Sequence, residues 1–400
     1  MTIEGPRIIH MLVDNPMISD FRVEREAQAL TDTGWQVHIH AVQRPDLPTH
    51  ELKSFGHLER SLPRSIRSPL SMDYARSRSK FARELKNRGV QVIHAHDHAC
   101  LDFAVAVKRI SSSVRIVYDA HEYLAGWPLY KDIPEPFDRL KGYLVWRWSV
   151  LRERANIPFA DSMITVSKSL CAEFKSNYQL KAAPLLIRNI PNTKHDITIM
   201  DMNEILGIDE SLHIHVHSGN VYHSDARIAM LLRSYVRRKD IFLLFICNTF
   251  NKAKVLRVAE SEGLEWTHRI GFIDYPKDHD QLMGMLASCD VGVIHTWQPD
   301  WPSHWLSLPN RLMEYTLCGL PIIATKQPEF MSFQKQMGHC VLFHGEDENE
   351  LDSAIDQVEM NTQHLKMMAK QAAGSISWEQ ESKALLDLHH SLQPRAMDRP

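Results

Sequence analysis

The chain has 400 residues, of which 44% are hydrophobic and 24% charged, and its formal net charge is −3. A chain of this length is expected to form two domains, each with its own buried core, and its charge excludes a strong overall attraction to nucleic acid. The N-terminal residues lack a basic segment followed by an apolar one, and no run of 18 apolar residues occurs, so neither a signal peptide nor a membrane-spanning helix is predicted.

The first half of the chain alternates short apolar runs with amphipathic stretches. Strands are expected at 7–13, 37–42, 90–95, 114–119, 162–166 and 185–187, and helices at 19–33 and 101–110. Strand, helix and strand in repetition is typical of parallel βαβ units in a sheet that is covered on both faces. We therefore expect residues 1–197 to form an N-terminal Rossmann-like domain.

The same pattern begins again near residue 213. Strands are expected at 213–217, 241–247, 290–295 and 321–325, and helices at 226–236, 282–287 and 311–317. The predicted fold class is α/β, with two tandem Rossmann-like doubly wound domains that face each other across a cleft. The second domain is expected to span 198–375, after a linker at 189–200, and residues 376–400 to form a helix that crosses back to the first domain, followed by a tail. In such sheets ligands bind beyond the carboxyl ends of the strands.

The most informative stretch is 308–325, LPNRLMEYTLCGLPIIAT. Asn310, Arg311 and Glu314 open a short helix, Gly319 stops it, and Pro321 begins a buried strand. The free N–H groups of a helix N-terminus bind anions, and a carboxylate one turn inside can accept hydrogen bonds from the two hydroxyls of a ribose. This stretch predicts a nucleotide-sugar pocket.

Two further segments of the second half follow predicted strands. Gly219 and Asn220, with His223 and Arg227 close behind, come directly after the strand 213–217. A glycine lets the backbone approach a ligand closely, and an arginine offers a delocalised positive charge to a diphosphate. The triplet 271–273, containing Phe272 and Ile273, is interpreted either as a wall for a nucleobase or as an ordinary turn.

Histidines cluster in HAHDH at 94–98, after the predicted strand 90–95. Alternation sends His94, His96 and His98 to one face of an extended segment, which suits metal ligands. No HExxH motif and no partner cysteine accompanies them, and the six cysteines lack CxxC spacing, which favours reduced thiols in a cytoplasmic protein. We expect no metal and no cofactor, and assign His96 and Asp97 to a polar loop that lines the acceptor site.

The segment VYDAHE follows the next strand. His121 is expected to contact the sugar that is transferred, with Glu122 on the acceptor side. The alternative is a capping box, in which Asp119 caps a helix and Glu122 lies three residues on.

The loop 14–25 joins the first strand to its helix and contains no glycine. This composition weakens the case for NAD or FAD, because dinucleotide folds carry GxGxxG at this position. Asp20 and Arg22 are candidates for holding an acceptor substrate. The alternative is that they only cap and solvate the helix.

Residues 53–88 hold ten Lys or Arg against three Asp or Glu. Such a basic face attracts anionic lipid headgroups, which would place the protein peripherally on the inner face of a membrane, and the alternative is a solvated helix face. Aromatic residues are sparse in this segment, so a nucleic-acid partner is not expected.

The motifs RVEREAQAL, HAHD, VYDAHE, ADSMITVS, IRNIPN and PNRLMEYTLCGLPIIAT occur in that order along the chain. In this order the chain resembles the bacterial glycosyltransferases of family 4, which have the GT-B fold. The resemblance implies a nucleotide-diphosphate sugar on the second domain, an acceptor on the first, transfer with retention of the anomeric configuration, and no need for a metal.

By the same resemblance, Glu314 would hold the ribose hydroxyls, His121 would lie near the transferred sugar, and Arg227 would lie near the residue that neutralises the diphosphate. The chain departs from the family pattern at Leu306, where a first glutamate is frequent, and at Asn220, where an arginine is frequent. The predicted catalytic residues are His121, Arg227 and Arg311. The predicted donor-binding residues are Gly219, Asn220, His223, Phe272, Ile273, Asn310, Leu312 and Glu314, and the predicted acceptor-side residues are Asp20, Arg22, His96, Asp97 and Glu122.

The predicted function is transfer of a sugar from a UDP- or GDP-sugar to a glycan or lipid-linked acceptor, in bacterial cell-surface polysaccharide or glycoconjugate synthesis. The departure at Leu306 motivates a second hypothesis, a catalytically silent GT-B scaffold that binds a glycan or a protein partner. A sugar-nucleotide epimerase of the same fold is a third, supported only by the tandem sheets.

Overall fold

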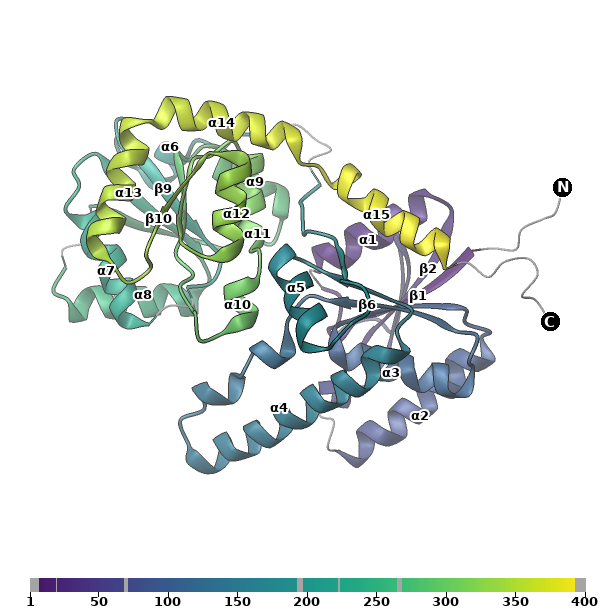
Figure 1. Ribbon diagram of the computed structural model, residues 1–400. Helices are drawn as coiled ribbons and strands as arrows, with labels where there is room; N and C mark the ends of the chain where they lie inside the picture. Colours follow the sequence, from purple (N-terminus) through teal and green to yellow (C-terminus); the bar gives the residue numbers. More distant parts are fainter. Residues whose placement is uncertain are drawn as a thin grey trace. The chain divides into compact units, whose positions relative to one another are not determined.

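The computed structural model describes residues 7–18, 20–67, 71–192, 197–221, 224–264 and 268–392 (Figure 1). The chain divides into two compact units. Unit 1 comprises Met1–Arg188, Trp301–Ser303 and Glu379–Pro400, and unit 2 comprises Asn189–Asp300 and His304–Trp378. The sequence-based boundaries at 197/198 and 375/376 stay predictions.

Unit 1 contains an eight-stranded sheet in the order β3-β4-β2-β1-β5-β6-β7-β8. Its strands are β1 Arg7–Leu12, β2 Trp35–Val42, β3 His50–Lys53, β4 Gly56–Leu62, β5 Val92–His96, β6 Arg115–Ala120, β7 Ser162–Thr165 and β8 Leu185–Leu186. All neighbours are parallel except β3 and β4. The parallel strands lie within two residues of their predicted positions, whereas the β3–β4 hairpin was not predicted. A Cβ at Gly56, whose φ is +132°, would lie 2.5 Å from the carbonyl oxygen of Val37, so a larger residue would collide there.

The helices of unit 1 cover both faces of this sheet (Figure 1). They are α1 Phe21–Asp32, α2 Met72–Asn87, α3 Asp97–Ile110, α4 Pro136–Asn156, α5 Lys168–Asn177 and α15 Trp378–Ser391, which enters the unit at Glu379. Asp20 caps α1, because its side chain accepts a hydrogen bond from the N–H of Val23. The long helix α4 was not predicted. Histidine contacts tie α15 to unit 1, since His389 Nε2 lies 3.1 Å from His94 Nδ1.

Unit 2 contains a six-stranded parallel sheet in the order β11-β10-β9-β12-β13-β14. Its strands are β9 His213–Ser218, β10 Ile241–Cys247, β11 Ile270–Asp274, β12 Val291–Ile294, β13 Ile322–Thr325 and β14 Cys340–Phe343. Leu243 and Phe245 of β10 belong to one hydrophobic cluster, and Leu244 and Ile246 to another. Because alternate residues of a strand point to opposite faces, this sheet has a core on each side, as a doubly wound fold requires.

The helices of unit 2 alternate with these strands along the chain. They are α6 Met202–Leu206, α7 Asp225–Val236, α8 Thr249–Ser261, α9 His279–Ala287, α10 Pro302–Leu306, α11 Asn310–Leu317, α12 Pro328–Met337, α13 Glu348–Met360 and α14 Thr362–Ser375. Of α10, Pro302 and Ser303 belong to unit 1. The fold class is therefore confirmed as α/β with two parallel-stranded Rossmann-like sheets. Two details differ from prediction: Phe272 and Ile273 lie in strand β11, not in a turn, and part of the predicted linker, 193–196, lies outside the described residues.

Within the described part of the chain, no helix is both long enough and apolar enough to cross a membrane.

The basic segment 53–88 is only partly a surface feature. Arg60 is 4% exposed and donates hydrogen bonds to the carbonyl oxygens of Pro16 and Pro48. Arg78 and Arg88 form ion pairs with Asp102 and Glu59. The exposed cations are concentrated on α2, at Arg76, Lys80, Arg83 and Lys86. Binding of this segment to a membrane stays a prediction.

Four histidines stack across β1, β2 and β4. The ring of His10 stacks on those of His38 and His40, and His38 stacks on His57, with centroids 5.1–5.2 Å apart. Burial and the neighbouring imidazoles lower the pKa of His10 to about 3, and burial together with Arg88 lowers the pKa of His40 to about 3. Both rings are therefore neutral at pH 7, where His10 Nδ1 and His40 Nε2 share a hydrogen bond of 2.9 Å.

We expect acid to unfold unit 1 through these two rings. A histidine with a lowered pKa binds fewer protons in the folded state, so its contribution is present above the ordinary value of 6.5 and is lost as the pH falls toward 3. When the pH falls from 7.5 to 5, each of the two rings should lower the free energy of unfolding by roughly 2 kcal/mol. Urea titrations of the wild type and of His40→Gln at both pH values measure this effect. An equal shift of the unfolding midpoint in both proteins would contradict it.

Candidate functional site

The clearest candidate site of unit 2 lies where β9 ends and α11 begins. Gly219 directly follows β9 with a φ of +82°, and its N–H donates to the carbonyl oxygen of Ile246 over 2.8 Å. A Cβ built on Gly219 would lie 3.7 Å from Nη2 of Arg311. Arg311 is the second residue of α11, and its Nη2 donates to the carbonyl oxygen of Asn220 over 3.1 Å. The turn after the strand and the start of the helix are therefore held together by one guanidinium.

His217 completes this group, which we call the Arg311 cluster: His217, Gly219, Asn220 and Arg311. Nη1 of Arg311 lies 3.0 Å from Nε2 of His217, which is fully buried. Burial first, and then the charge of Arg311, hold the pKa of His217 well below its usual value. The imidazole is therefore neutral and accepts from the guanidinium. Two acceptors orient Arg311 beside a strand-end turn, an arrangement suited to an anion.

Glu314 lies one turn further along α11. It is 6% exposed, and its Oε1 lies 3.2 Å from Nε2 of His279, the first residue of α9. A ligand hydroxyl could reach this carboxylate only by sharing or replacing the histidine contact. This burial weighs against the prediction that Glu314 holds the ribose hydroxyls.

Several predicted donor residues are engaged within the protein. Arg227 forms an ion pair of 2.6 Å with Glu346 and a hydrogen bond with the carbonyl oxygen of Trp297, so its charge is already compensated. The amide of Asn310 accepts from Asn189 over 2.7 Å. His223 lies outside the described residues.

Leu312 does not fit its predicted role as a donor contact. Its side chain is fully buried in a hydrophobic cluster of unit 2, and its N–H donates to the carbonyl oxygen of Pro309 over 3.0 Å. Phe272 stacks on Phe245 with ring centroids 5.5 Å apart. Its role and that of Ile273 at a nucleobase stay predictions.

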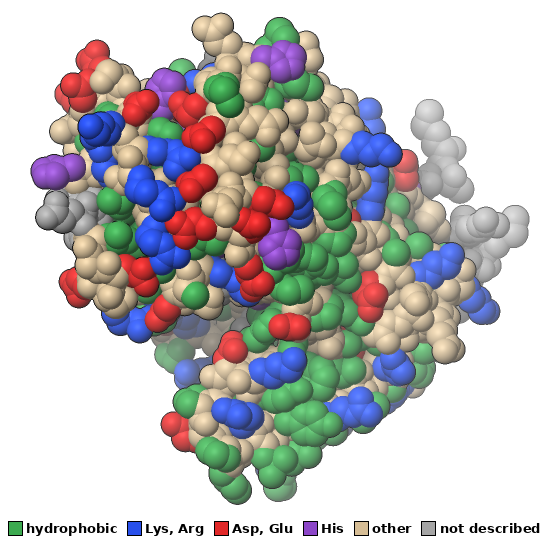
Figure 2. Space-filling model, turned by 60° about the vertical axis from the view of Figure 1, so that its left-hand side comes forward, with side chains coloured by type: hydrophobic (Ala, Val, Ile, Leu, Met, Phe, Trp, Pro, Cys, Tyr) green, Lys and Arg blue, Asp and Glu red, His purple; other side chains and the backbone are tan. Residues whose placement is uncertain are grey.

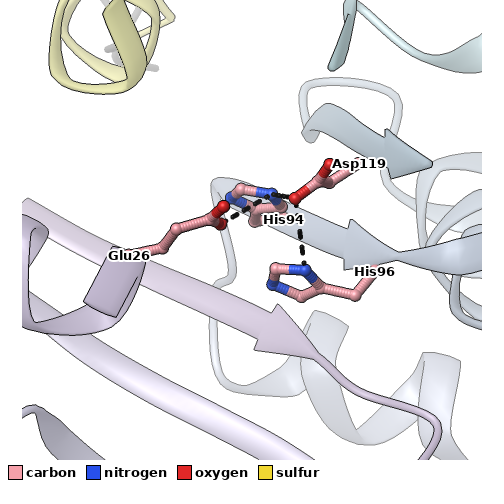
Figure 3. Close-up of side chains that lie close together, drawn as sticks. All are labelled: Glu26, His94, His96 and Asp119. Carbon is pink, nitrogen blue, oxygen red and sulfur yellow. Dashed lines mark ion pairs between the residues drawn. The ribbon is translucent and has the colours of Figure 1, made fainter. Parts of the chain in front are cut away.

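Unit 1 contains a second group at the carboxyl ends of β5 and β6, which we call the Asp119 cluster: Arg22, Glu26, His94, His96, Asp119 and His121. The rings of His94 and His96 stack with centroids 4.4 Å apart, which confirms that they share one face. Figure 3 shows Glu26, His94, His96 and Asp119 pointing toward one another. Nε2 of His94 lies 3.7 Å from both carboxylates, and Nδ1 of His96 lies 3.5 Å from Asp119. His98 lies within α3, so the predicted alternation ends at His96.

Arg22 occupies the centre of the Asp119 cluster. Its Nε and Nη2 donate to both oxygens of Asp119 over 3.0–3.2 Å, and Nη1 donates to the carbonyl oxygen of Ile187. Nη2 also lies 3.1 Å from Glu26, four residues along α1. The side chain is only 5% exposed. Arg22 therefore supports the buried carboxylates; the structure does not present it to an acceptor substrate, as the sequence analysis had proposed.

His121 carries a positive charge within this group. Burial alone would lower the pKa of His121, but the carboxylates of Asp119 and Asp97 raise it to about 10. Nε2 of His121 lies 3.1 Å from Asp119, and its backbone N–H donates to Asp97 over 3.0 Å. Asp119, although buried, has a pKa held well below its usual value by Arg22 and His121. The side chain of His121 keeps 22% exposure, so it can still meet a ligand.

The remaining first-half predictions have mixed outcomes. Asp20 serves as the helix cap, and its other oxygen accepts from Asn15 over 2.7 Å. The capping box of Asp119 and Glu122 is wrong, because Asp119 lies within the buried strand β6, which ends at Ala120, and Glu122 accepts from Ser303 over 2.9 Å. His96 is 1% exposed, so it faces neighbouring side chains, not solvent.

The predicted site residues omit Glu26 and His217 of these two clusters, and they omit His279 and His389, which contact Glu314 and His94. Glu26 could have been found, because it lies four residues after Arg22 on a predicted helix. His279 and His389 could not, since each meets its partner only through the tertiary fold.

The Asp119 cluster also has the chemistry of a metal site. Ligand atoms of Glu26, His94, His96 and Asp119 lie within 4.8 Å of one another, and two imidazoles with two carboxylates would suit zinc or manganese. However, the guanidinium of Arg22 already contacts both carboxylates. A divalent ion among them would face this cation in a buried site of low dielectric, which is unfavourable. We therefore retain the expectation that no metal is needed.

This expectation can be tested with a chelator. Dialysis against EDTA should leave sugar transfer within a factor of two of the untreated rate, because Arg22 balances the carboxylates. The metal content of the dialysed protein is measured in parallel. Loss of activity that zinc or manganese restores would refute the expectation.

Two Rossmann-like sheets in tandem, each with its polar residues at the carboxyl ends of parallel strands, define the GT-B class of fold. Residues 22–192 match the model of Glycosyltransferase Family 4. Over these residues, which make up less than half of the chain, the sequence is similar to glycosyltransferase family 4. A comparison with curated proteins gives no match.

Solved structures share the fold across nearly the whole chain. Sucrose-phosphate synthase from Thermosynechococcus elongatus has 16% sequence identity and a TM-score of 0.74, with 96% of this chain and 99% of that chain covered. HepE from Anabaena, solved in complex with UDP-glucose, has 14% identity and a TM-score of 0.68, with 96% and 99% covered. A glycosyltransferase from Rickettsia africae has 13% identity and a TM-score of 0.65, with 97% and 99% covered.

Proposed function

We propose that this chain transfers a sugar, with retention, from a UDP- or GDP-sugar to a hydroxyl group of a glycan or a lipid-linked acceptor. The reaction would belong to bacterial cell-surface polysaccharide or glycoconjugate synthesis, at the cytoplasmic face of a membrane. The donor would bind unit 2 and the acceptor unit 1. The match of residues 22–192 to the model of Glycosyltransferase Family 4 supports the reaction class. The complexes of Anabaena HepE with UDP and with UDP-glucose are examples of nucleotide and nucleotide-sugar binding by a protein of this fold.

The observation that carries the proposal is the Arg311 cluster. A guanidinium held at a strand-end turn and at a helix N-terminus is placed where doubly wound sheets bind ligands. Loss of a nucleoside diphosphate concentrates negative charge on the leaving phosphate. Arg311 would stabilise that charge as it develops, in a pre-oriented position and without a metal.

The part of the proposal that concerns unit 1 rests on His121. As a charged donor with partial exposure, it would bind a hydroxyl of the transferred sugar. Asp97 and Glu122 border it, because Asp97 accepts from the backbone N–H groups of both His121 and Glu122. We infer a front-face transfer in which the departing phosphate oxygen takes the proton of the acceptor hydroxyl and the new glycosidic bond forms on the face that the diphosphate leaves.

A silent scaffold is the second candidate, and the structure offers one observation in its favour. At Asn220, where the family frequently has an arginine, the side chain accepts from Asn251 over 3.1 Å and offers no charge. Arg227 is compensated by Glu346. If neither residue contributes a free positive charge, binding of the donor diphosphate would depend mainly on Arg311.

Calorimetry with UDP, GDP and their sugars separates the two candidates. The enzyme should bind one nucleotide class in the micromolar range and release the free diphosphate when an acceptor is supplied. A scaffold should show no heat of binding with any nucleotide. Absence of binding across the whole panel would overturn the proposal.

A further inference from the structure

Helix α4 exposes a stripe of large hydrophobic side chains. Phe137, Leu140, Leu144 and Leu151 are exposed by 80%, 57%, 54% and 51%. Their spacing of three, four and seven residues places them on one face of the helix. Figure 2 shows hydrophobic side chains gathered at the lower end of the view, with Lys and Arg among them. We call these four residues the α4 stripe.

The stripe is not the face by which α4 packs in unit 1. The buried residues of α4 are Ser149, Val150, Glu153 and Asn156, and α4 packs against α3. At 100° per residue these positions lie on the side of the helix opposite the stripe. Trp146 also points inward, because its Nε1 donates to the carbonyl oxygen of Leu124 over 3.0 Å. The large aliphatic and phenyl side chains of the stripe therefore lie on the exposed face of the helix, whereas three of its four buried residues are polar.

Cations flank the α4 stripe on both sides. On a helical wheel Lys141 and Arg152 lie along one edge, and Arg147 and Arg154 along the other. Lys141 and Arg147 are exposed, whereas Arg152 pairs with Asp102 and Arg154 donates to Asn177. The carboxylates of Asp138 and Glu153 project away from the stripe. An apolar strip bordered by Lys and Arg is the pattern of a helix that lies in a membrane interface, with the long cationic side chains reaching the headgroups.

A second helix adds positive charge on the same side of the sheet. Helices α2 and α4 both pack against α3, and α2 carries the exposed cations Arg76, Lys80 and Arg83. Met72, the first residue of α2, is 73% exposed. Charge and apolar surface therefore occur together on one side of unit 1.

We propose that the α4 stripe, with the exposed cations of α2, docks on an anionic lipid bilayer. The positive charge favours a lipid surface over a second copy of the protein as the partner. Two copies of this surface would bring like charges together, whereas anionic headgroups complement the cations. The proposal adds an apolar anchor to the basic segment predicted from sequence. It does not rest on the proposed function, because it concerns binding to lipid in the absence of any nucleotide.

Co-sedimentation of the full chain with vesicles tests the proposal. Two kinds of vesicle are compared: one of phosphatidylcholine alone, and one of phosphatidylcholine with about 30% phosphatidylglycerol, which is anionic. Phe137→Gln and Leu140→Gln each remove one side chain of the stripe. Phe250→Gln is the matched control, because Phe250 is also the second residue of its helix and is 76% exposed, close to the 80% of Phe137. Lys141→Gln, compared with Lys335→Gln on α12, tests the charge.

The wild type should sediment with anionic vesicles and at least tenfold more weakly with neutral ones. Phe137→Gln and Leu140→Gln should lower the partition coefficient at least fivefold, Lys141→Gln about twofold, and both control variants should bind like the wild type. Equal binding by the stripe variants and the wild type, or no binding by the wild type, would overturn the proposal. So would a self-association measured by ultracentrifugation that the stripe variants abolish, since the surface would then be a protein interface. If the membrane proposal fails by any of these results but the protein still binds nucleotide, the proposed function is unaffected.

Discussion

Replacing Arg311 with alanine is expected to lower the turnover of sugar transfer by about 10²–10³-fold, the range found when a pre-oriented electrostatic group is removed from an active site. Arg311 is the cation that the structure holds at the strand-end turn of unit 2. Arg227, by contrast, is paired with Glu346, so Arg227→Ala should slow turnover by less. The order of the two effects tests the assignment more sharply than either variant alone.

The measurement is kcat and KM for donor turnover, with thermal unfolding to confirm the fold. Arg311→Lys is informative, because a lysine keeps the charge but cannot contact His217 and Asn220 through one planar group. It should recover only part of the lost rate. Arg237→Ala is the control, since Arg237 is 52% exposed and pairs with Glu348 and Asp352 on helix α13. An Arg311→Ala enzyme within threefold of the wild type would remove the Arg311 cluster from the mechanism.

Replacing Glu314 with glutamine is expected to raise the dissociation constant of the nucleotide sugar by roughly 10- to 150-fold, the value of one hydrogen bond to a charged group. The prediction requires the ribose hydroxyls to displace or share the contact between Glu314 and His279. Glutamine preserves the shape of the side chain and removes the charge. Turnover at saturating donor should change less than affinity, because the ribose is distant from the reacting bond.

Calorimetry with the preferred nucleotide measures this affinity. Glu359→Gln is a matched control, because Glu359 also pairs with a histidine of unit 2, His215, over 2.9 Å. Glu359 pairs with His213 as well, which is the first residue of β9, so this carboxylate lies at the amino end of the sheet, away from the predicted donor site. It should bind nucleotide like the wild type. An unchanged dissociation constant in Glu314→Gln, with the fold intact, would show that Glu314 and His279 form only a structural contact.

Much of the candidate donor site could be located from local sequence. The helix over 310–317, the positive φ of Gly319 and the buried strand after Pro321 all follow from residue types at short range. The parallel strands were equally accessible, because buried strands of this fold are nearly continuous apolar runs. Helix α4 was not found, because its periodic apolar residues lie on its exposed face and most of its buried residues are polar, which is the reverse of the usual pattern.

Which side of each element faces a neighbour was beyond local sequence. Leu312 lies between Arg311 and Glu314, yet its side chain belongs to the core. Arg22 lies in a loop-to-helix segment typical of a substrate contact, yet it neutralises Asp119, which is 97 residues away. Only the tertiary contact between Arg22 of α1 and Asp119 of β6 shows that a buried carboxylate needs this guanidinium, because an unpaired buried charge is strongly unfavourable.

The sequence by itself determined the repeated strand–helix pattern, the positions of most parallel strands and a motif order that resembles glycosyltransferase family 4, because these depend on apolar runs and short-range turn chemistry. Only the tertiary structure decided which charges are already paired. It placed Arg311 beside His217 and Asn220, compensated Arg227 with Glu346 and left the α4 stripe uncovered. The physical reason is that an ion pair or an exposed face depends on distances between residues far apart in the chain, which no local pattern encodes.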